Sequence, residues 1–296
     1  MQIITIMLPD FALILIGFLL FRSNFQPIDF WNGLEKLVYF ILFPALLFYS
    51  TSRTAFDFAE TGKLLQSSIA ATMVAIAFGW LAKPFFLVAP MVFESGVQTA
   101  FRFNSYIGLA LASRIAGEMG TSLMALLIGF GVPLCNAAAV HALSHKKSGL
   151  FKALARNPLL LATVAGVLFS VTGLHFPEPV NAVLSRLGNA SIAIGLICVG
   201  AGLRLSGVHR SKLIGTYFLA VKLVLLPATA YFLGRWMGLT TLHLQILIVF
   251  CALPTASSAY VLATRMGGDG PFVAFLISSG TLISVVTLPL WLLLVS

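Results

Sequence analysis

Ten long apolar segments follow one another along the chain, separated by short polar connections. Crossing the hydrocarbon core of a bilayer takes about 20 mostly apolar residues. The segments lie at about residues 3–21, 34–52, 63–88, 97–113, 119–144, 157–173, 181–204, 211–236, 243–264 and 271–295. Because lipid offers the backbone no hydrogen-bond partner, such segments fold as helices. The sequence therefore predicts an all-α integral membrane protein with ten transmembrane helices.

Composition and charge agree with this class and give an orientation. Charged residues make up 9% of the chain, whereas a soluble domain has about 25%. Lys and Arg are concentrated in connections after odd-numbered segments, above all in the stretch from His145 to Lys152 between the two halves. Those connections should be cytoplasmic. We therefore expect a bacterial inner (plasma) membrane protein with both termini periplasmic or extracellular, and the net charge of +9 indicates lipid attraction rather than nucleic-acid binding.

The two halves of the chain resemble each other. Ala112–Glu118 reads ASRIAGE and Ala263–Asp269 reads ATRMGGD, 151 positions later, while Pro9 in the first segment recurs as Pro158. Repeats of this kind are typical of transporters. The expected domains are a five-helix repeat at 1–148 and a second at 149–296. Because five is odd, the second repeat must be inverted relative to the first.

Segments four and nine hold the densest polar and helix-breaking residues. Asn104, Ser105 and Tyr106 lie in segment four, and Pro254 is followed by a run of Thr and Ser at the matching depth of segment nine. Proline inside a helix removes a hydrogen bond and clashes with the preceding turn. The alternative is that Pro254 is a simple kink and that the hydroxyls bond back to their own helix.

Four groups of residues resemble the auxin efflux carrier superfamily of plant PIN proteins and bacterial membrane transport proteins. They are Asn104-Ser105, Val132-Pro133-Leu134-Cys135-Asn136, Lys222-Leu223 with Pro227, and Ala252-Leu253-Pro254 with Tyr260-Val261-Leu262-Ala263. The resemblance extends over the whole chain in the spacing of these groups along the sequence. It implies a fold like that of sodium/proton antiporters and bile-acid carriers, with broken helices four and nine crossing at the substrate site. It also implies outward termini, in agreement with the charge distribution.

The chain departs from the plant members at one position of segment four. The crossover proline of those members is replaced here by Gly108, which permits an irregular turn without requiring one. The long cytoplasmic loop of many plant carriers is also missing. Both departures favour the small organic acids associated with bacterial members, malate or malonate, over auxin.

The expected site binds a carboxylate at the crossing of the two broken helices. Helix N-termini carry unpaired N–H groups and partial positive charge, and an Asn side chain adds donors without burying a full charge. The expected substrate-binding residues are Asn104, Ser105, Tyr106, Asn136, Pro254, Thr255, Ser257 and Ser258. Gly108, Lys222 and Pro227 are expected in structural or coupling roles. Tyr260 is an alternative to Tyr106 as a residue lining the cavity.

Four charged residues lie within or near the ends of the segments, and each has an expected environment. Lys222 is mid-way along segment eight, where it either pairs or snorkels towards the interface. Arg102 is expected to be an interfacial anchor rather than an anion-attracting residue. Asp10 and Glu118 lie near segment ends and are expected to be solvated.

These patterns favour a secondary transporter of small organic anions that works by alternating access, with a scaffold of segments one, two, six and seven. The alternatives are an anion channel and, with less support, a membrane enzyme, because no nucleophile, base and carboxylate set lies at a suitable depth. No cofactor or metal is expected, and Cys135, Cys198 and Cys251 are interpreted as apolar fillers. The expected partners are the substrate anion and the lipid bilayer; a homodimer is compatible with the sequence.

Overall fold

The computed structural model describes residues 2–54, 57–143, 158–203 and 211–295. All regular secondary structure in this part of the chain is helical, and it contains no strand. The basic connection from His145 to Lys152 lies outside the described residues. The expectation of an all-α protein is therefore confirmed for the part that the structure describes.

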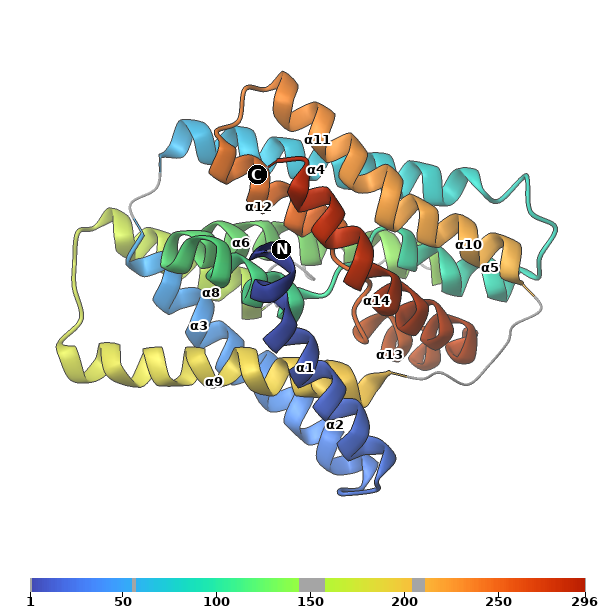
Figure 1. Cartoon of the computed structure of the whole chain (residues 1–296), viewed down its shortest axis with the longest axis horizontal. Coiled ribbons are helices and arrows are strands. Elements are labelled where there is room, and N and C mark those ends of the chain that lie inside the picture. Colours follow the sequence, from blue (N-terminus) through green and yellow to red (C-terminus); the bar gives the residue numbers. More distant parts are fainter. Residues whose placement is uncertain (1, 55–56, 144–157, 204–210, 296) are drawn as a thin grey trace. The chain divides into compact units, whose positions relative to one another are not determined.

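The helices coincide with the apolar segments (Figure 1). The first half contains α1 (Gln2–Arg22), α2 (Ile28–Leu37), η1 (Val38–Leu42), α3 (Phe43–Ser52), α4 (Phe58–Leu81), α5 (Pro90–Gly96), η2 (Val97–Ala100) and α6 (Ser105–Leu143). The second half contains α8 (Pro158–Val171), α9 (Glu178–Gly202), α10 (Lys212–Ala220), η3 (Val221–Leu225), α11 (Leu226–Trp236), α12 (Thr241–Ala252), α13 (Ser258–Arg265) and α14 (Gly270–Leu293).

Among the residues that the structure describes, six helical stretches are long and apolar enough to cross a membrane. They are Ile28–Ser52, Phe58–Leu81, Pro90–Leu143, Glu178–Gly202, Lys212–Trp236 and Gly270–Leu293. Two shorter apolar helices are α8 and α12. These stretches identify an integral membrane protein, whereas the full count of ten spans stays a prediction.

The helices form two compact units, and each unit draws on both halves of the chain. The first unit comprises residues 1–61, 105–130 and 151–202, and the second comprises 62–104, 131–150 and 203–296. The first unit thus contains the four segments expected to form a scaffold, which are represented by α1, by α2 to α3, by α8 and by α9. The repeats at 1–148 and 149–296 are a relation between sequences and stay a prediction.

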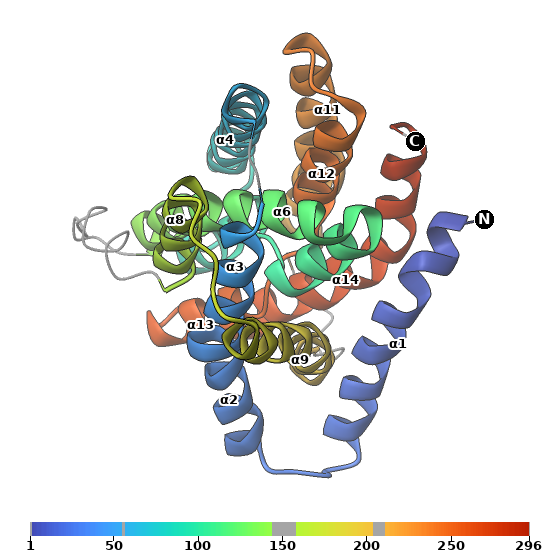
Figure 2. The ribbon, with the colours of Figure 1, turned by 90° about the vertical axis from the view of Figure 1, so that its left-hand side faces the viewer.

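Close backbone approach holds the first unit together. A Cβ atom on Gly17 of α1 would overlap the main-chain oxygen of Ile197 on α9, and a Cβ on Gly200 would overlap that of Ile14. The two glycines therefore let α1 and α9 pack main chain against main chain, as small residues do in membrane helices. On the other side of α9, α3 lies against both α8 and α9 (Figure 2).

In the second unit, α10, η3 and α11 form one continuous helix (Figure 1), in which η3 is a short π-helical stretch. Pro227 follows this π-helical stretch and has no N–H to donate to the carbonyl of Leu223, four residues earlier. The indole Nε1 of Trp291 on α14 donates to that carbonyl at 2.9 Å. Pro227 is thus accommodated because a side chain from α14 replaces the lost backbone bond.

Replacing Trp291 by phenylalanine should destabilise the protein by about 1–3 kcal/mol, the cost of leaving a buried carbonyl unsatisfied. The ring is retained, so the loss is that of the indole donor to Leu223. Thermal unfolding in detergent measures it. Trp236→Phe serves as the control, because Trp236 is 83% exposed at the end of α11. Equal stability of the two variants would contradict this role of Trp291.

Candidate substrate site

The helix of segment nine is broken at Pro254. The first part, α12, ends at Ala252, and Leu253 has extended backbone angles (φ −59°, ψ 142°). Helical structure resumes only at Ser258 with α13. A simple proline kink would keep the helix continuous on both sides, so the kink interpretation is wrong and the break expected in segment nine is present.

Segment four is broken as well, although it has no proline at this point. The turn η2 ends at Ala100, residues 101–104 are not helical, and α6 begins at Ser105. Gly108 lies four residues beyond the break, inside regular helix. The break expected in segment four is therefore present, upstream of Gly108, and the irregular turn that this glycine would permit does not occur.

The two breaks satisfy each other's backbone groups. The N–H of Asn104 donates to the carbonyl of Pro254 at 2.8 Å. The hydroxyl of Thr255 donates to the carbonyl of Thr99 at 2.9 Å, so this side chain does not bond back to its own helix. All four residues are buried. Polar backbone groups that a helix would have paired are thus paired across the crossing, as an apolar environment requires.

Aromatic packing supports the crossing from one side. The rings of Phe103 and Phe250 lie 4.4 Å apart between centroids. A Cβ atom on Gly131 of α6 would come within 3.0 Å of both rings. Gly131 therefore leaves the space in which the two rings meet.

Beyond the crossing, a run of backbone N–H groups leads into α13. Within the described part of the chain, the N–H groups of Thr255, Ala256, Ser257 and Ser258 meet no acceptor. Thr255 is buried, Ser257 is half-buried and Ser258 is exposed. Successive N–H donors at a helix N-terminus, with its partial positive charge, suit a carboxylate or another anion.

Arg102 lies in the crossing and is only 8% exposed. Its Nη1 donates to Oε1 of Gln98 at 3.1 Å, and its Nη2 donates to the hydroxyl of Ser258 at 3.1 Å. An interfacial anchor would place its charge in the solvated rim. The anchor interpretation of Arg102 is therefore wrong, because this guanidinium is buried between the two broken segments.

Lys222 also reaches the crossing. Its Nζ donates to the carbonyl of Cys251 at 3.1 Å, in the last turn of α12, and the side chain is 1% exposed. Cations are stabilised at helix C-termini, where carbonyls lack helical partners. The snorkelling alternative is wrong for Lys222. The thiol of Cys135 on α6 donates to the carbonyl of Phe101, in the break of segment four, at 3.5 Å.

Other residues expected at the site have different surroundings. Ser105 and Tyr106 open α6 and belong to the first unit, where the Tyr106 ring packs on Phe43 at 4.6 Å between centroids. Asn136 is half-buried, and its amide forms no hydrogen bond with the described residues. Tyr260 is 40% exposed. The crossing is thus formed by Asn104 and residues 254–258, without a hydrogen bond from Asn136.

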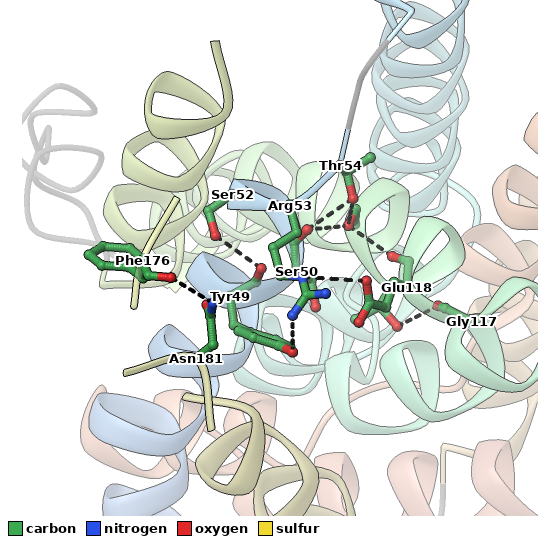
Figure 3. A network of polar contacts seen from close by, with 11 residues as sticks. Tyr49, Ser50, Ser52, Arg53, Thr54, Gly117, Glu118, Phe176 and Asn181 are labelled. Atoms are coloured by element: carbon green, nitrogen blue, oxygen red, sulfur yellow. Dashed lines mark hydrogen bonds and ion pairs between the residues drawn. The ribbon is translucent and has the colours of Figure 1, made fainter. Parts of the chain in front are cut away.

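Elsewhere in the first unit, the turn within α6 is fixed by a polar network (Figure 3). The helix is interrupted at Ala116 and Gly117, and Gly117 has the positive φ of 56° that glycine tolerates. Glu118 follows this turn and lies 3.8 Å from Arg53 at the end of α3. Glu118 is exposed, as expected for a residue near a segment end.

Asp10 differs from that expectation. It is 3% exposed on α1, and its carboxylate accepts two hydrogen bonds from Arg114 of α6, at 2.8 and 2.9 Å. Arginine and carboxylate match in this bidentate geometry. The expectation of a solvated Asp10 is therefore wrong, because the Arg114 guanidinium replaces its water.

The residues that the sequence expectations missed are Arg102, in its actual role, its partner Gln98, and Thr99, whose carbonyl accepts from Thr255. A usable signal was present, because Arg102 is a charge two residues from Asn104 within an apolar segment. All three cysteines are free and buried. No group of three metal-binding side chains occurs among the residues that the structure describes.

Comparisons with known proteins assign the chain to a family. A relative from Rhizobium meliloti (strain 1021), named "Putative malonate transporter", is 27% identical over 97% of this chain and 93% of its own length. The "Uncharacterized transporter YfdV" of Escherichia coli (strain K12) is 25% identical over 97% and 95%. An "Uncharacterized transporter" of Methanothermobacter thermautotrophicus is 23% identical over 95% and 94%.

The family model described as "Membrane transport protein" matches residues 141–292, which is more than half of the chain. This is the family of the auxin efflux carriers, to which the residues of segments four, five, eight and nine already pointed. The fold agrees, because the regular structure of the described residues is all helical and includes several stretches long and apolar enough to span a membrane. This chain therefore belongs to the membrane transport protein family of auxin efflux carriers.

Proposed function

We propose that this protein is a secondary transporter of small organic anions, which binds a substrate carboxylate at the crossing of its two broken helices. The main support is the run of N–H groups from Thr255 to Ser258, which meets no acceptor among the described residues. It starts beside the backbone bond between Asn104 and Pro254. Two buried cations, Arg102 and Lys222, add positive charge to the same unit.

The proposed architecture has ten transmembrane helices in two inverted five-helix repeats, 1–148 and 149–296. Two observations support it. Asn104 and Thr255 occupy the two breaks at an offset of 151 positions. Positive-φ glycines follow both broken segments, at Gly117 and Gly267. The repeats would enclose the site between them and expose it alternately to each side of the membrane.

The proposed substrates are malate- or malonate-type carboxylates, with auxin-like acids as the second class. The name of the Rhizobium meliloti relative supports the first class. Partners are the substrate anion and the lipid bilayer, and a homodimer is a candidate assembly. The proposed location is the bacterial inner membrane, with both termini periplasmic, in agreement with the distribution of Lys and Arg.

Counterflow in proteoliposomes tests this proposal. Vesicles loaded with one unlabelled acid should accumulate labelled malate, malonate or indole-acetate from outside, with saturation. We expect Asn104→Ala to lower the rate about 10- to 100-fold, the effect of losing one or two hydrogen bonds to a charged group. Pro254→Leu should also lose exchange, because a continuous helix would remove the free N–H groups.

Asn189→Ala is the matched control, because Asn189 is exposed on α9. Exchange at the wild-type rate in Asn104→Ala would contradict the proposed site. A channel, the alternative function, would pass labelled anion without dependence on the acid inside. An enzyme would convert the acid chemically, which analysis of the recovered label detects.

A further inference from the structure

Lys222 is a deeply buried amine with few hydrogen-bond acceptors around it. It lies in η3, and its side chain is 1% exposed. A charged lysine has three N–H donors, but within the described residues its Nζ donates to a single acceptor, the carbonyl of Cys251, at 3.1 Å. A buried charge is stable only when it is paired and its donors are satisfied. The described residues therefore support a positive charge on Lys222 incompletely.

No carboxylate balances this charge from the helices that pack against η3, which are α12, α14 and η2. The sequences of α14 and η2 hold no ionisable residue, and α12 holds only His243, near its start, and Cys251. Besides Cys251, the ionisable group of the described chain that interacts with Lys222 is the thiol of Cys135 on α6. The adjoining helices α10 and α11 add Lys212, Tyr217, Tyr231 and Arg235. Arg102, which follows η2, is itself a cation.

The proposed anion site begins close to the carbonyl that Lys222 contacts. The N–H groups that suit a carboxylate run from Thr255 to Ser258, and Thr255 is four residues after Cys251. The Cα atoms of these two residues are therefore at most about 14 Å apart. At an effective dielectric constant of about 20, opposite unit charges about 15 Å apart shift a proton-binding equilibrium about 5- to 10-fold. An anion at the crossing thus supplies the negative charge that Lys222 lacks.

We propose that Lys222 binds a proton that is transported together with the substrate anion. In the empty site, part of the population has a neutral amine at Lys222. When an anion binds at the crossing, the lone pair of that amine takes a proton from the aqueous phase, and the site then holds an ammonium group and an anion. Release of the anion on the other side of the membrane returns the proton there. This proposal rests on the proposed function, because it takes the crossing to be the transport site.

Protonation of Lys222 and anion binding favour each other. Because the anion increases the proton affinity of the amine, protonation increases the anion affinity by the same factor. The anion affinity is therefore greatest at a pH low enough for the empty site to be protonated. It should fall about 5- to 10-fold in total as the pH rises through the point at which the loaded site loses its proton.

The first test counts the protons that are taken up when an anion binds. Protein in weakly buffered detergent solution receives malate, malonate or indole-acetate, whichever exchanges fastest in counterflow, and an indicator dye follows the pH between about 7 and 10. The wild-type protein should take up about 0.4–0.5 proton per bound anion where the effect is greatest. Lys222→Arg should bind the anion without proton uptake, because a guanidinium stays protonated.

Two control variants identify the group that takes the proton. Lys212→Arg changes an exposed lysine at the start of α10 and should keep the wild-type proton count. The double variant Cys135→Ala/Cys251→Ala should also keep proton uptake, because alanine retains the carbonyl of residue 251. Loss of the uptake in this double variant would assign the proton to a thiol and overturn the role of Lys222.

The second test measures transport in proteoliposomes at zero membrane potential. An inward proton gradient should drive net uptake of the acid by the wild-type protein but not by Lys222→Arg. Anion binding without proton uptake in the wild-type protein would overturn proton coupling and leave the transporter standing, as would undiminished uptake of protons by Lys222→Arg. Absence of exchange for all three acids would overturn the proposed function and this proposal together. If Lys222→Arg fails to fold, Lys222→Gln replaces it, and the wild-type proton count alone can still refute the coupling.

Discussion

Replacing Gly200 by alanine is expected to destabilise the protein by about 3 kcal/mol or more, at or above the upper end of the range for overpacked cores. The new Cβ would overlap the main-chain oxygen of Ile14 on α1. If the new Cβ met a side chain of α1, that side chain could rotate away. It meets a backbone oxygen instead, which can move only if α1 and α9 separate. Loss of the folded fraction in detergent, followed by size-exclusion chromatography and thermal unfolding, measures the effect.

Gly33→Ala is the matched control for this change. Gly33 lies inside α2, and a Cβ there has no neighbour within 4 Å. Alanine should therefore leave the protein unchanged or stabilise it by about 0.5–1 kcal/mol, because glycine is the poorer helix former. If Gly200→Ala unfolded at the same temperature as Gly33→Ala, α1 and α9 would not be packed as described.

Replacing Arg114 by methionine should cost about 3–5 kcal/mol, because it leaves the buried carboxylate of Asp10 without its cation. The Asp10 side chain is 5% exposed, and both of its oxygens accept from Arg114. Unfolding of the variant by heat or by a denaturing detergent gives the change in stability. The double variant Asp10→Leu/Arg114→Met should recover most of the loss, since no charge then remains buried.

The second ion pair of the same unit provides the comparison. Arg53 and Glu118 are 3.8 Å apart with side chains 44% and 58% exposed. Arg53→Met should therefore cost no more than about 1 kcal/mol, as is usual for solvated pairs. Failure of the double variant to recover stability would mean that Arg114 acts through contacts other than Asp10.

The helices could be predicted from the sequence because each apolar segment has a single way to satisfy its backbone in lipid. The break at Pro254 could also be predicted from the sequence, since proline removes a backbone hydrogen-bond donor wherever it stands. The break at residues 101–104 could be expected only from the family resemblance, because no residue there enforces it. It depends on groups far along the chain: the carbonyl of Pro254, 150 positions from Asn104, and the hydroxyl of Thr255, 156 positions from Thr99.

The buried charged residues show the same limit. Lys222 was recognisable as costly inside an apolar segment, and that cost implies a partner without naming it. Arg102 and Asp10 were placed at the solvated ends of their segments, because the sequence does not show that a partner buries them. The partners of the three residues are the Cys251 carbonyl, Gln98 with Ser258, and Arg114. Most of these partners lie on other helices, and the sequence does not show which helices meet. Only the three-dimensional arrangement could identify them.

The two hydrogen bonds between the breaks also determine when each half of the chain can complete its fold during synthesis and membrane insertion. A ribosome releases Thr99 and Asn104 about 150 residues before Pro254 and Thr255. Until the later residues enter the bilayer, the carbonyl of Thr99 and the N–H of Asn104 must be satisfied by water, the insertion machinery or a provisional helix. The first half of the chain therefore reaches its final form only after the second half has been inserted, and a prematurely terminated chain would present unpaired backbone to membrane quality control.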